Sequence, residues 1–458
     1  MKRFMLVGIL SVLFLFQGMA AANTAYEQAK IECLSAWVSL AAYNDRIGLL
    51  ARSELMDEGW AIKQYQESYG GVDAKFFVVD KADPVTGDGT YLLVITGTES
   101  QKDIHLDLNI HKVFFGGTTR ETFFTEAQRA KVVSTDPMVH KGFDDYVRAA
   151  FFTKEYDGIT FGEYIAKILK EKPGAKLYIT GHSLGGAVAT LASARLSMLG
   201  VPANQIEVIS FGAPAVGNET FARMYGDKLQ LDRIVIAGDP VKGVLQAVSE
   251  GYVQFGSPKE WQANRNSEKF KHEMVVYVDA ALRNFYDVRR EAEAAGERID
   301  DEKDKTEPEL KAGEKVYIAP FAFKLDEKIA DDRTYMEEAL KDNFRERIPG
   351  CVFSKGIRGS VREECEKARA AGCQYVVIED FLGKRIQKEE YNFAMMMQEE
   401  IYDVDGHFLG GQETATNTGE MTPIEAILRA QTALKASRER TLFGKNYKAK
   451  ELRQNEKN

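Results

Sequence analysis

The stretch Lys176-Leu177-Tyr178-Ile179-Thr180-Gly181-His182-Ser183-Leu184-Gly185 decides the fold. Its apolar first half has the pattern of a buried strand, and a helical pattern follows at Ala187–Met198. A strand, a G-x-S-x-G turn and a helix in that order are typical of a nucleophile elbow, which lifts a serine hydroxyl above a sheet. We expect glycine at Gly181 and Gly185 because a side chain there would meet the neighbouring backbone of this strained turn. Ser183 is therefore the candidate nucleophile.

The bulk composition restricts the partners of the chain. The sequence has 458 residues, long enough for two domains, and a net charge of −9 with a pI near 5.5. Nucleic acid is not an expected partner because it would require a basic face. The acidic balance also gives no reason to expect electrostatic docking to an anionic membrane.

The first 22 residues have the parts of a signal peptide. Met1-Lys2-Arg3 is basic, Phe4–Phe16 is apolar, and small residues end the segment at Ala20 and Ala22. Residues 1–22 are predicted to be removed, leaving a soluble exported protein, either periplasmic or extracellular. An uncleaved anchor is the alternative, although the apolar run falls short of the roughly 20 residues that span a bilayer.

The four cysteines suggest at most one disulfide in an exported protein. Cys351, Cys365 and Cys373 lie close together in the sequence, so one bridge is possible there, with Cys351–Cys373 or Cys351–Cys365 as the favoured pairs and the connectivity left open. Cys33 falls in an apolar helical pattern and is expected to be a buried thiol.

The chain between the signal peptide and residue 286 alternates between strand and helix patterns, which predicts a mostly parallel sheet covered by helices on both faces. This first domain is predicted over residues 23–286. The expected strands include Lys176–Thr180, Glu207–Phe211, Arg233–Ala237 and Met274–Val278.

The composition changes after this domain. Residues 287–314 are rich in charge and poor in apolar side chains, which indicates a solvated helix that frays into a charged linker. A second, small α/β sandwich domain is predicted over 315–445, with Arg385–Tyr402 as one long strand and a final helix over Thr422–Arg438. Residues 446–458 are expected to form a disordered tail.

A serine hydroxyl needs a base, and the base needs an acid that fixes its tautomer. In α/β hydrolases the acid and then the histidine follow the serine along the chain. Of the histidines after Ser183, His407 lies beyond the linker, which leaves His272. Several acidic residues lie between Ser183 and His272, and Asp239 is chosen because it directly follows a predicted strand, where catalytic loops gather. Asp232 precedes the same strand and is at the wrong end.

An oxyanion hole requires two donors near Ser183. One is the backbone N–H of Leu184, directly after the nucleophile. The other is predicted at Thr98, where the strand Val94-Ile95-Thr96 runs into the glycine turn at Gly97. An ordinary turn is the alternative for this segment. The residues imply no metal and no cofactor.

These motifs resemble the class 3 (fungal-type) lipase family, whose members have the α/β-hydrolase fold. Gly181–Ala187 is similar to the family elbow, and Phe211-Gly212-Ala213-Pro214 with Val216-Gly217-Asn218 is similar to its F-G-x-P-x-V-G-N signature. Asp239-Pro240-Val241 and His140-Lys141-Gly142-Phe143 resemble its acid and H-x-G-F motifs. The likeness covers roughly residues 30–280 and implies a serine hydrolase of glycerolipid esters, a lipase or phospholipase.

Two departures from the family bear on the oxyanion loop and its cover. Thr96 stands where the family often has arginine, and Ile104 lies near the place of a lid tryptophan. The segment 100–137 is long and carries the pairs Phe114-Phe115 and Phe123-Phe124, which would suit a lid that opens on a lipid surface. A core role for these aromatic residues is the alternative.

The second domain more weakly resembles envelope-associated domains related to the N-terminal domain of TolB. The stretch Ala370–Val377 and the turn Asp403-Val404-Asp405-Gly406 carry this likeness. Binding, targeting or contact with an envelope protein is what the resemblance implies. The turn is also similar to the start of a calcium loop, but a hairpin turn is the expected structure. An envelope scaffold with a relic hydrolase domain and a short-chain esterase remain the alternative functions.

Overall fold

The computed structural model describes residues 25–82, 89–97, 111–133, 135–156, 158–243, 251–256, 258–265, 269–296, 315–348, 350–386 and 389–444. The chain divides into two compact units, Met1–Asn264 with Lys269–Glu297, and Arg265–Glu268 with Arg298–Asn458. The predicted signal peptide and the predicted tail over 446–458 lie outside the described residues.

The first unit is built on a seven-stranded sheet with the order β1-β2-β3-β8-β9-β10-β11. The strands from β3 to β11 run parallel, and β1 and β2 add an antiparallel edge. This confirms the predicted mostly parallel α/β sheet. The strand bounds are β1 Ala61–Tyr69, β2 Val72–Ala82, β3 Gly89–Ile95, β8 Leu177–His182, β9 Ile206–Phe211, β10 Gln230–Ile236 and β11 Pro258–Trp261.

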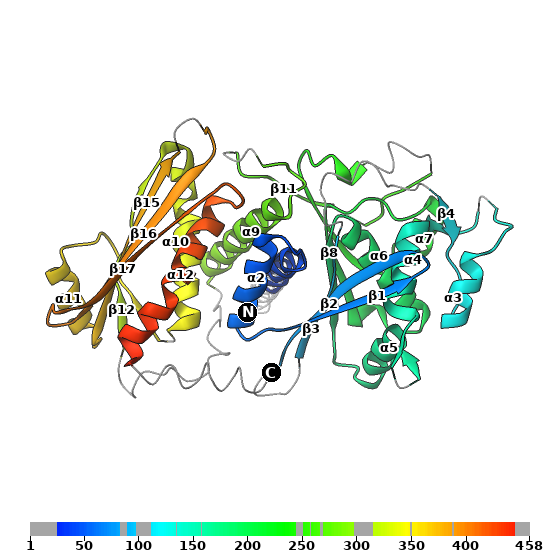
Figure 1. The fold of residues 1–458 in the computed structure, drawn as a ribbon, viewed down its shortest axis with the longest axis horizontal. Coiled ribbons are helices and arrows are strands. Elements are labelled where there is room, and N and C mark those ends of the chain that lie inside the picture. Colours follow the sequence, from blue (N-terminus) through cyan, green and yellow to red (C-terminus); the bar gives the residue numbers. More distant parts are fainter. Residues whose placement is uncertain are drawn as a thin grey trace, which may run out of the picture. The chain divides into compact units, whose positions relative to one another are not determined.

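Helices cover both faces of this sheet (Figure 1). A helix over residues 25–41 lies with α2 (Arg46–Asp57) and α9 (Met274–Ala294) on one face. The other face carries α4 (Lys141–Phe152), α5 (Phe161–Glu171), α6 (Leu184–Met198) and α7 (Glu219–Tyr225). The remaining elements of this unit are short: β4 Lys112–Phe114, α3 Arg120–Ala127, β5 Met138–His140, β6 Glu155–Tyr156, β7 Ile159–Thr160, η2 Ala203–Gln205 and η3 Val241–Gly243.

Helix α6 begins directly after Ser183 and is buried on all sides. Its small side chains allow close approach to the sheet, and an added Cβ at Gly186 would stand 2.9 Å from the Ala213 Cβ. A helix that is apolar around its whole circumference belongs in the centre of a layered fold. The helix that follows the elbow is therefore a rigid central element.

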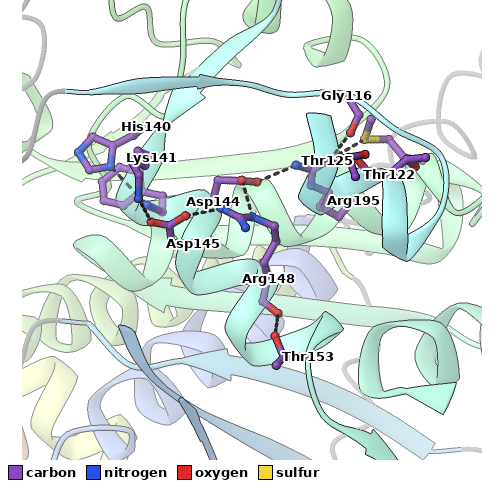
Figure 2. A network of polar contacts seen from close by, with 12 residues as sticks. Gly116, Thr122, Thr125, His140, Lys141, Asp144, Asp145, Arg148, Thr153 and Arg195 are labelled. Carbon is purple, nitrogen blue, oxygen red and sulfur yellow. Dashed lines mark hydrogen bonds and ion pairs between the residues drawn. The ribbon is translucent and has the colours of Figure 1, made fainter. Parts of the chain in front are cut away.

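Buried ion pairs tie α6 to α4 (Figure 2). The Arg195 guanidinium, fully buried, donates to Asp144 Oδ1 at 2.7 Å and to the Gly116 carbonyl at 2.7 Å. Asp144 Oδ2 accepts a second bond from Arg148 at 2.9 Å. Because a buried charge is tolerated only when it is paired and hydrogen-bonded, this network requires all its members. It fixes the segment that leads from β4 against the two helices.

A second charged cluster holds the N-terminal helix against the sheet. Glu32 on that helix accepts from the Lys259 ammonium of β11, which also donates to Asp232 of β10 at 2.6 Å. Burial raises the pKa of Glu32 to about 7, with the Lys259 charge opposing the shift and the Asp232 charge adding to it. Asp232, the acid candidate rejected on sequence grounds, thus lies in a structural cluster.

This cluster predicts that the first unit loses stability as the pH rises through neutrality. The pKa of Glu32 is raised from 4.5 to about 7 on folding. Its contribution is therefore fully present below about pH 4.5 and is lost as the pH rises through 7, up to about 3 kcal/mol at 1.36 kcal/mol per pKa unit. Calorimetry of thermal unfolding at about pH 4 and about pH 8.5 measures it, because this interval contains both the unfolded and the folded pKa of Glu32.

Glu32→Gln should flatten this dependence, whereas Glu27→Gln, an exposed neighbour on the same helix, should retain it. An unchanged slope in Glu32→Gln would contradict the assignment of the titration to Glu32.

The second unit contains a six-stranded sheet with the order β14-β12-β15-β16-β17, to which β13 adds by pairing with β15. Helix α11 packs against β15, and α12 packs on β16, β17 and α10. The bounds are β12 Val316–Ile318, β13 Ala322–Leu325, η4 Glu327–Asp332, α10 Arg333–Arg347, β14 Val352–Phe353, α11 Val361–Ala370, β15 Tyr375–Arg385, β16 Phe393–Asp403, β17 Phe408–Asn417 and α12 Pro423–Phe443.

The core of the second unit holds two carboxyl groups against one guanidinium. Glu379 and Glu399 are register partners on β15 and β16, and Arg438 of α12 bonds both, at 3.1 Å to Glu379. Burial raises the pKa of Glu379 well above its ordinary value, with Arg438 opposing the shift and Glu399 adding to it. The two bonds of Arg438 fix α12 against the face of the sheet.

Several local predictions were wrong. The apolar run Met274–Val278, predicted as a strand, instead begins helix α9. Helix α9 ends at Ala294, within the charged segment where a helix that frays into a linker was predicted. Arg385–Tyr402 is the end of β15, a turn and most of β16. The β-branched run Met274–Val278 is helical because its packing against the sheet face outweighs its strand propensity.

The possible disulfide at Cys351 is not present, because its two candidate partners are free thiols. Cys365 and Cys373 both lie buried in the apolar cluster of α11 and β15. Among the described helices, none has the length and apolarity that crossing a bilayer requires.

Candidate active site

Ser183 occupies the turn between β8 and α6. Its φ of 57° makes it the one non-glycine with positive φ among the described residues. The turn is closely packed. A Cβ added at Gly181 would lie 2.5 Å from the Gly185 carbonyl carbon, and a Cβ added at Gly185 would lie 2.3 Å from the Ile95 carbonyl oxygen. A strained backbone held by its surroundings is typical of a functional position.

His272 lies two residues before α9 and points one ring nitrogen at Asp239. Nδ1 is 2.8 Å from Asp239 Oδ2, and both side chains are fully buried. Because an ionised carboxylate only accepts hydrogen bonds, Nδ1 carries the proton. Nε2 is buried and has no hydrogen-bond partner in the described part of the chain. The second nitrogen is thus available to take a proton.

Asp239 is held by two further donors. Val241 N–H donates to Oδ1 at 2.8 Å, and the Tyr277 hydroxyl donates to Oδ2. The Tyr277 oxygen in turn accepts from Ile236 N–H at 3.2 Å. Burial raises the pKa of Tyr277 well above its ordinary value, and the Asp239 charge adds to this, so the hydroxyl keeps its proton. Sequence reasoning missed Tyr277 because it placed this residue in a strand.

Gly212 lies directly against this group. It has a φ of +58°, and a Cβ there would stand 2.9 Å from Asp239 Oδ2, 3.0 Å from His272 Cε1 and 2.7 Å from the Tyr277 hydroxyl. Sequence reasoning noted Gly212 only as part of a signature. The close approach explains why glycine is required at this position.

Of the two predicted oxyanion donors, Leu184 lies among the described residues and Thr98 does not. Leu184 is the first residue of α6, where backbone N–H groups have no intrahelical acceptor. Thr98 lies outside the described residues, although the chain leading to it is described. A Cβ at Gly97 would stand 2.6 Å from the His182 carbonyl oxygen, so this strand end lies against the elbow.

Within the predicted lid segment over 100–137, the described residues are 111–133 and 135–137. Phe115 and Phe123 are buried in the core of the first unit and contact the Arg195 guanidinium. Phe114 and Phe124 are half-buried. The core interpretation therefore holds for Phe115 and Phe123, and residues 100–110, including Ile104, lie outside the described residues.

The described residues contain one cluster with the geometry of metal ligands, and it lies in the second unit. Asp403, Asp405 and His407 stand at the β16–β17 turn, where His407 Nδ1 is 2.8 Å from Asp403 Oδ2 and Asp405 pairs with Arg369. Gly406 in this turn has a φ of +89°. The stretch likened to a calcium loop is thus the hairpin turn expected from the sequence.

The family model for lipase (class 3) matches residues 92–247, which confirms the family resemblance over this part of the chain. "Secreted mono- and diacylglycerol lipase 1" of Fusarium solani is 38% identical over 89 residues, 19% of this chain and 26% of that protein. "Phospholipase A(1) DAD1, chloroplastic" of Arabidopsis thaliana is 25% identical over 46% of this chain and 50% of its own. The chain thus spans half or less of these relatives.

Solved structures give a partial overlap. A triacylglycerol lipase whose catalytic centre is formed by a serine protease triad aligns with 52% of this chain and 80% of its own. The two are 22% identical, with a TM-score of 0.38.

Proposed function

We propose that the chain is a serine hydrolase that cleaves carboxylic esters through an acyl-enzyme. The observation that carries this proposal is the buried Asp239–His272 pair, at 2.8 Å, in which the second ring nitrogen of His272 bonds none of the residues that the structure describes. The His272 ring lies 4.5 Å from the ring of His182, the residue directly before the strained Ser183. An oriented base beside a serine held in a strained turn is the arrangement that activates a hydroxyl.

In the acylation half, Ser183 Oγ attacks the carbonyl carbon of the ester while His272 Nε2 takes the hydroxyl proton. Asp239 keeps the proton on Nδ1 and stabilises the imidazolium that forms. The Leu184 N–H, with Thr98 as second donor, holds the negative charge that develops on the carbonyl oxygen. The C–O bond to the alcohol then breaks, and His272 gives its proton to the leaving alkoxide.

In the deacylation half, water replaces the alcohol. His272 Nε2 takes a proton from the water, whose oxygen attacks the acyl carbon of the Ser183 ester. The tetrahedral intermediate collapses, the carboxylic acid leaves, and the proton on His272 returns to Ser183 Oγ. No electron transfer and no second substrate besides water is needed.

The substrate is proposed to be a glycerolipid acyl ester. The names of the relatives support this class, and Phe270 adds an apolar side chain that is 43% exposed, with its ring centroid 6.3 Å from that of His272. Such a side chain suits contact with acyl chains or a lipid surface, as does the proposed lid within 100–137. Ester chemistry is nevertheless better supported than the lipid, because specificity depends on pocket walls.

The test is hydrolysis of a p-nitrophenyl ester series from short to long acyl chains, with and without a dispersed lipid surface. Rates that rise toward long chains establish a lipase. A preference for short chains keeps the mechanism and changes the substrate to soluble esters. No turnover above that of the Ser183→Ala control, with lipid present, would overturn the proposal in favour of a scaffold.

We further propose that the protein is exported and that the second unit binds or targets. The basic and apolar pattern of residues 1–22 supports export, and a relative named as a secreted lipase agrees with it. Amino-terminal sequencing of the protein from cell fractions tests the cleavage. A chain ended near residue 310 should retain turnover of soluble esters if the second unit only targets.

Gly212→Ala is expected to lower kcat by about 10²-fold, because its Cβ would displace Asp239 or His272 from the reactive geometry. Steady-state hydrolysis of a short p-nitrophenyl ester measures the loss. Gly200→Ala is the matched control, since Gly200 also has positive φ, at +85°, but its Cβ would meet nothing within 4 Å. Equal losses in the two variants would show that backbone strain alone is responsible.

A further inference from the structure

His182, whose side chain has no role in the mechanism above, lies between the catalytic candidates and the N-terminal segment. Its ring is fully buried, 4.5 Å from the His272 ring and 5.6 Å from the Tyr277 ring by centroids. On its other side, at Nδ1, it meets the Tyr43 hydroxyl at 2.6 Å. A buried histidine in contact with both the base and the tyrosine of the acid is placed to influence both.

The hydrogen bond from Tyr43 determines which nitrogen of His182 carries a proton. Burial raises the pKa of Tyr43 well above its ordinary value, so the hydroxyl keeps its proton. Among the described contacts this hydroxyl has one hydrogen-bond partner, the Nδ1 of His182. If Tyr43 donates, one polar atom, the protonated His182 Nε2, is left buried without a partner among the described residues; the reverse bond would leave both Nε2 and the phenolic proton without one. Donation by Tyr43 is therefore favoured, which leaves Nδ1 as acceptor and places the ring proton on Nε2.

The surroundings also keep His182 neutral. Burial lowers the pKa of His182 well below its ordinary value, and the charge of His272 lowers it further, while a polar contact to the His272 backbone opposes both. The titratable groups that face this ring are Tyr43, His272 and Tyr277, with Asp239 behind them. Neutrality matters because His272 becomes an imidazolium during catalysis, and a second positive charge 4.5 Å away would oppose it.

Tyr43 is itself held in place. A Cβ at Gly97 would stand 2.6 Å from the Tyr43 hydroxyl and 2.6 Å from the His182 carbonyl, so the end of β3 packs closely over both. The helix that carries the chain to Tyr43 is bonded to β8 through Ser39 and Thr180, at 3.1 Å between their hydroxyls. The hydroxyl therefore reaches His182 from a rigid element.

We propose that Tyr43 and His182 form a positioning pair, in which Tyr43 holds His182 in one neutral tautomer and the His182 ring supports His272. This inference rests on the proposed hydrolase function. Neither residue touches the ester, so the pair acts through His272. A role of this kind changes the proton affinity of the base and its orientation, which a merely structural hydrogen bond would leave unchanged.

The experiment measures kcat and KM for a short p-nitrophenyl ester from about pH 5 to about pH 9, because kcat/KM reports the pKa values of the free enzyme. Tyr43→Phe should lower kcat by about 10- to 100-fold with little change in KM, as expected for a misplaced base. It should also shift the acidic limb of kcat/KM to higher pH, since His182 without its donor accepts a proton more readily and its positive charge then opposes the imidazolium that His272 must form.

His182→Asn retains an acceptor for the Tyr43 hydroxyl but has no ring to titrate. In the double variant Tyr43→Phe with His182→Asn, the shift of the acidic limb should therefore vanish. Tyr225→Phe is the matched control, because it removes another buried hydroxyl from the first unit without contacting His182. Persistence of the shift in the double variant, or a wild-type profile in Tyr43→Phe, would overturn the proposal.

An independent readout separates this inference from the proposed function. Nitrogen-15 NMR of histidine-labelled protein, with His182→Asn to assign the signal, should show protonated Nε2 and unprotonated Nδ1 without titration over this range. Tyr43→Phe should abolish that state. If wild type turned over no ester, the function would fail while this tautomer result stood; a titrating or Nδ1-protonated His182 in active wild type would overturn the pair alone.

Discussion

Ser183→Ala is expected to lower kcat for ester hydrolysis by up to about 10⁶-fold, the loss typical of a removed nucleophile in a triad. The remaining parts of the site cannot substitute for the hydroxyl, because no other oxygen nucleophile occupies the elbow. Substrate affinity should change little, since the substitution removes only the hydroxyl oxygen. The measurement is steady-state turnover of the best p-nitrophenyl ester, with thermal unfolding recorded for the same samples.

Stability should separate the nucleophile from its strain. Alanine keeps the Cβ at a φ of 57°, so Ser183→Ala should unfold at a similar temperature to wild type. Ser183→Gly should be more stable, because a non-glycine in such a backbone region costs about 1–3 kcal/mol. Ser193→Ala is the matched control, because it changes a buried serine of α6, the helix that follows Ser183; this variant should remain active. Turnover by Ser183→Ala near the wild-type rate would refute the assignment of Ser183.

Asp239→Asn is expected to lower kcat by about 10⁴-fold at neutral pH, the effect of a wrong tautomer in a triad of this kind. Val241 N–H donates to Oδ1, so the asparagine oxygen should stay there and its NH₂ should face His272. His272 Nδ1 would then accept a hydrogen bond, and the proton would move to Nε2. A histidine with its proton on Nε2 cannot take one from Ser183.

The matched control lies near the start of β10, the strand that leads to Asp239. Asp232→Asn changes the acid at the start of β10, which bonds Lys259 and Gln28 rather than His272. It should lower the unfolding temperature and leave kcat near that of wild type. If Asp232→Asn abolished turnover while Asp239→Asn did not, the choice between the two ends of the strand would be reversed.

The parts of the site that could be predicted are those that depend on neighbours in the chain. The elbow at Ser183 follows from glycines flanking a serine between a strand and a helix. Asp239 was chosen because it follows the predicted strand Arg233–Ala237, and Pro240 prevents that strand from continuing. His272 was found by elimination among six histidines, and it bonds Asp239 although the segment after it is a helix instead of the expected strand.

The parts that could not be predicted depend on contacts between distant segments. Tyr43 meets His182 across 139 positions, and no spacing rule relates them. Tyr277 reaches Asp239 only because Met274–Val278 is helical, and packing against the sheet decides this against the strand propensity of the run. Cys365 and Cys373 are thiols that pack in one apolar cluster with α11 and β15, which their spacing in the sequence does not show.

By itself the sequence therefore determined the sheet class, the elbow and the candidates for nucleophile, base and acid, because turn sterics and strand ends are local properties. The tertiary structure alone decided which buried groups support them: Tyr277 on Asp239, Gly212 against His272, and Tyr43 through His182. These contacts arise where the N-terminal helix, β9 and α9 meet at the carboxyl ends of the central parallel strands. That arrangement depends on the packing of the whole unit.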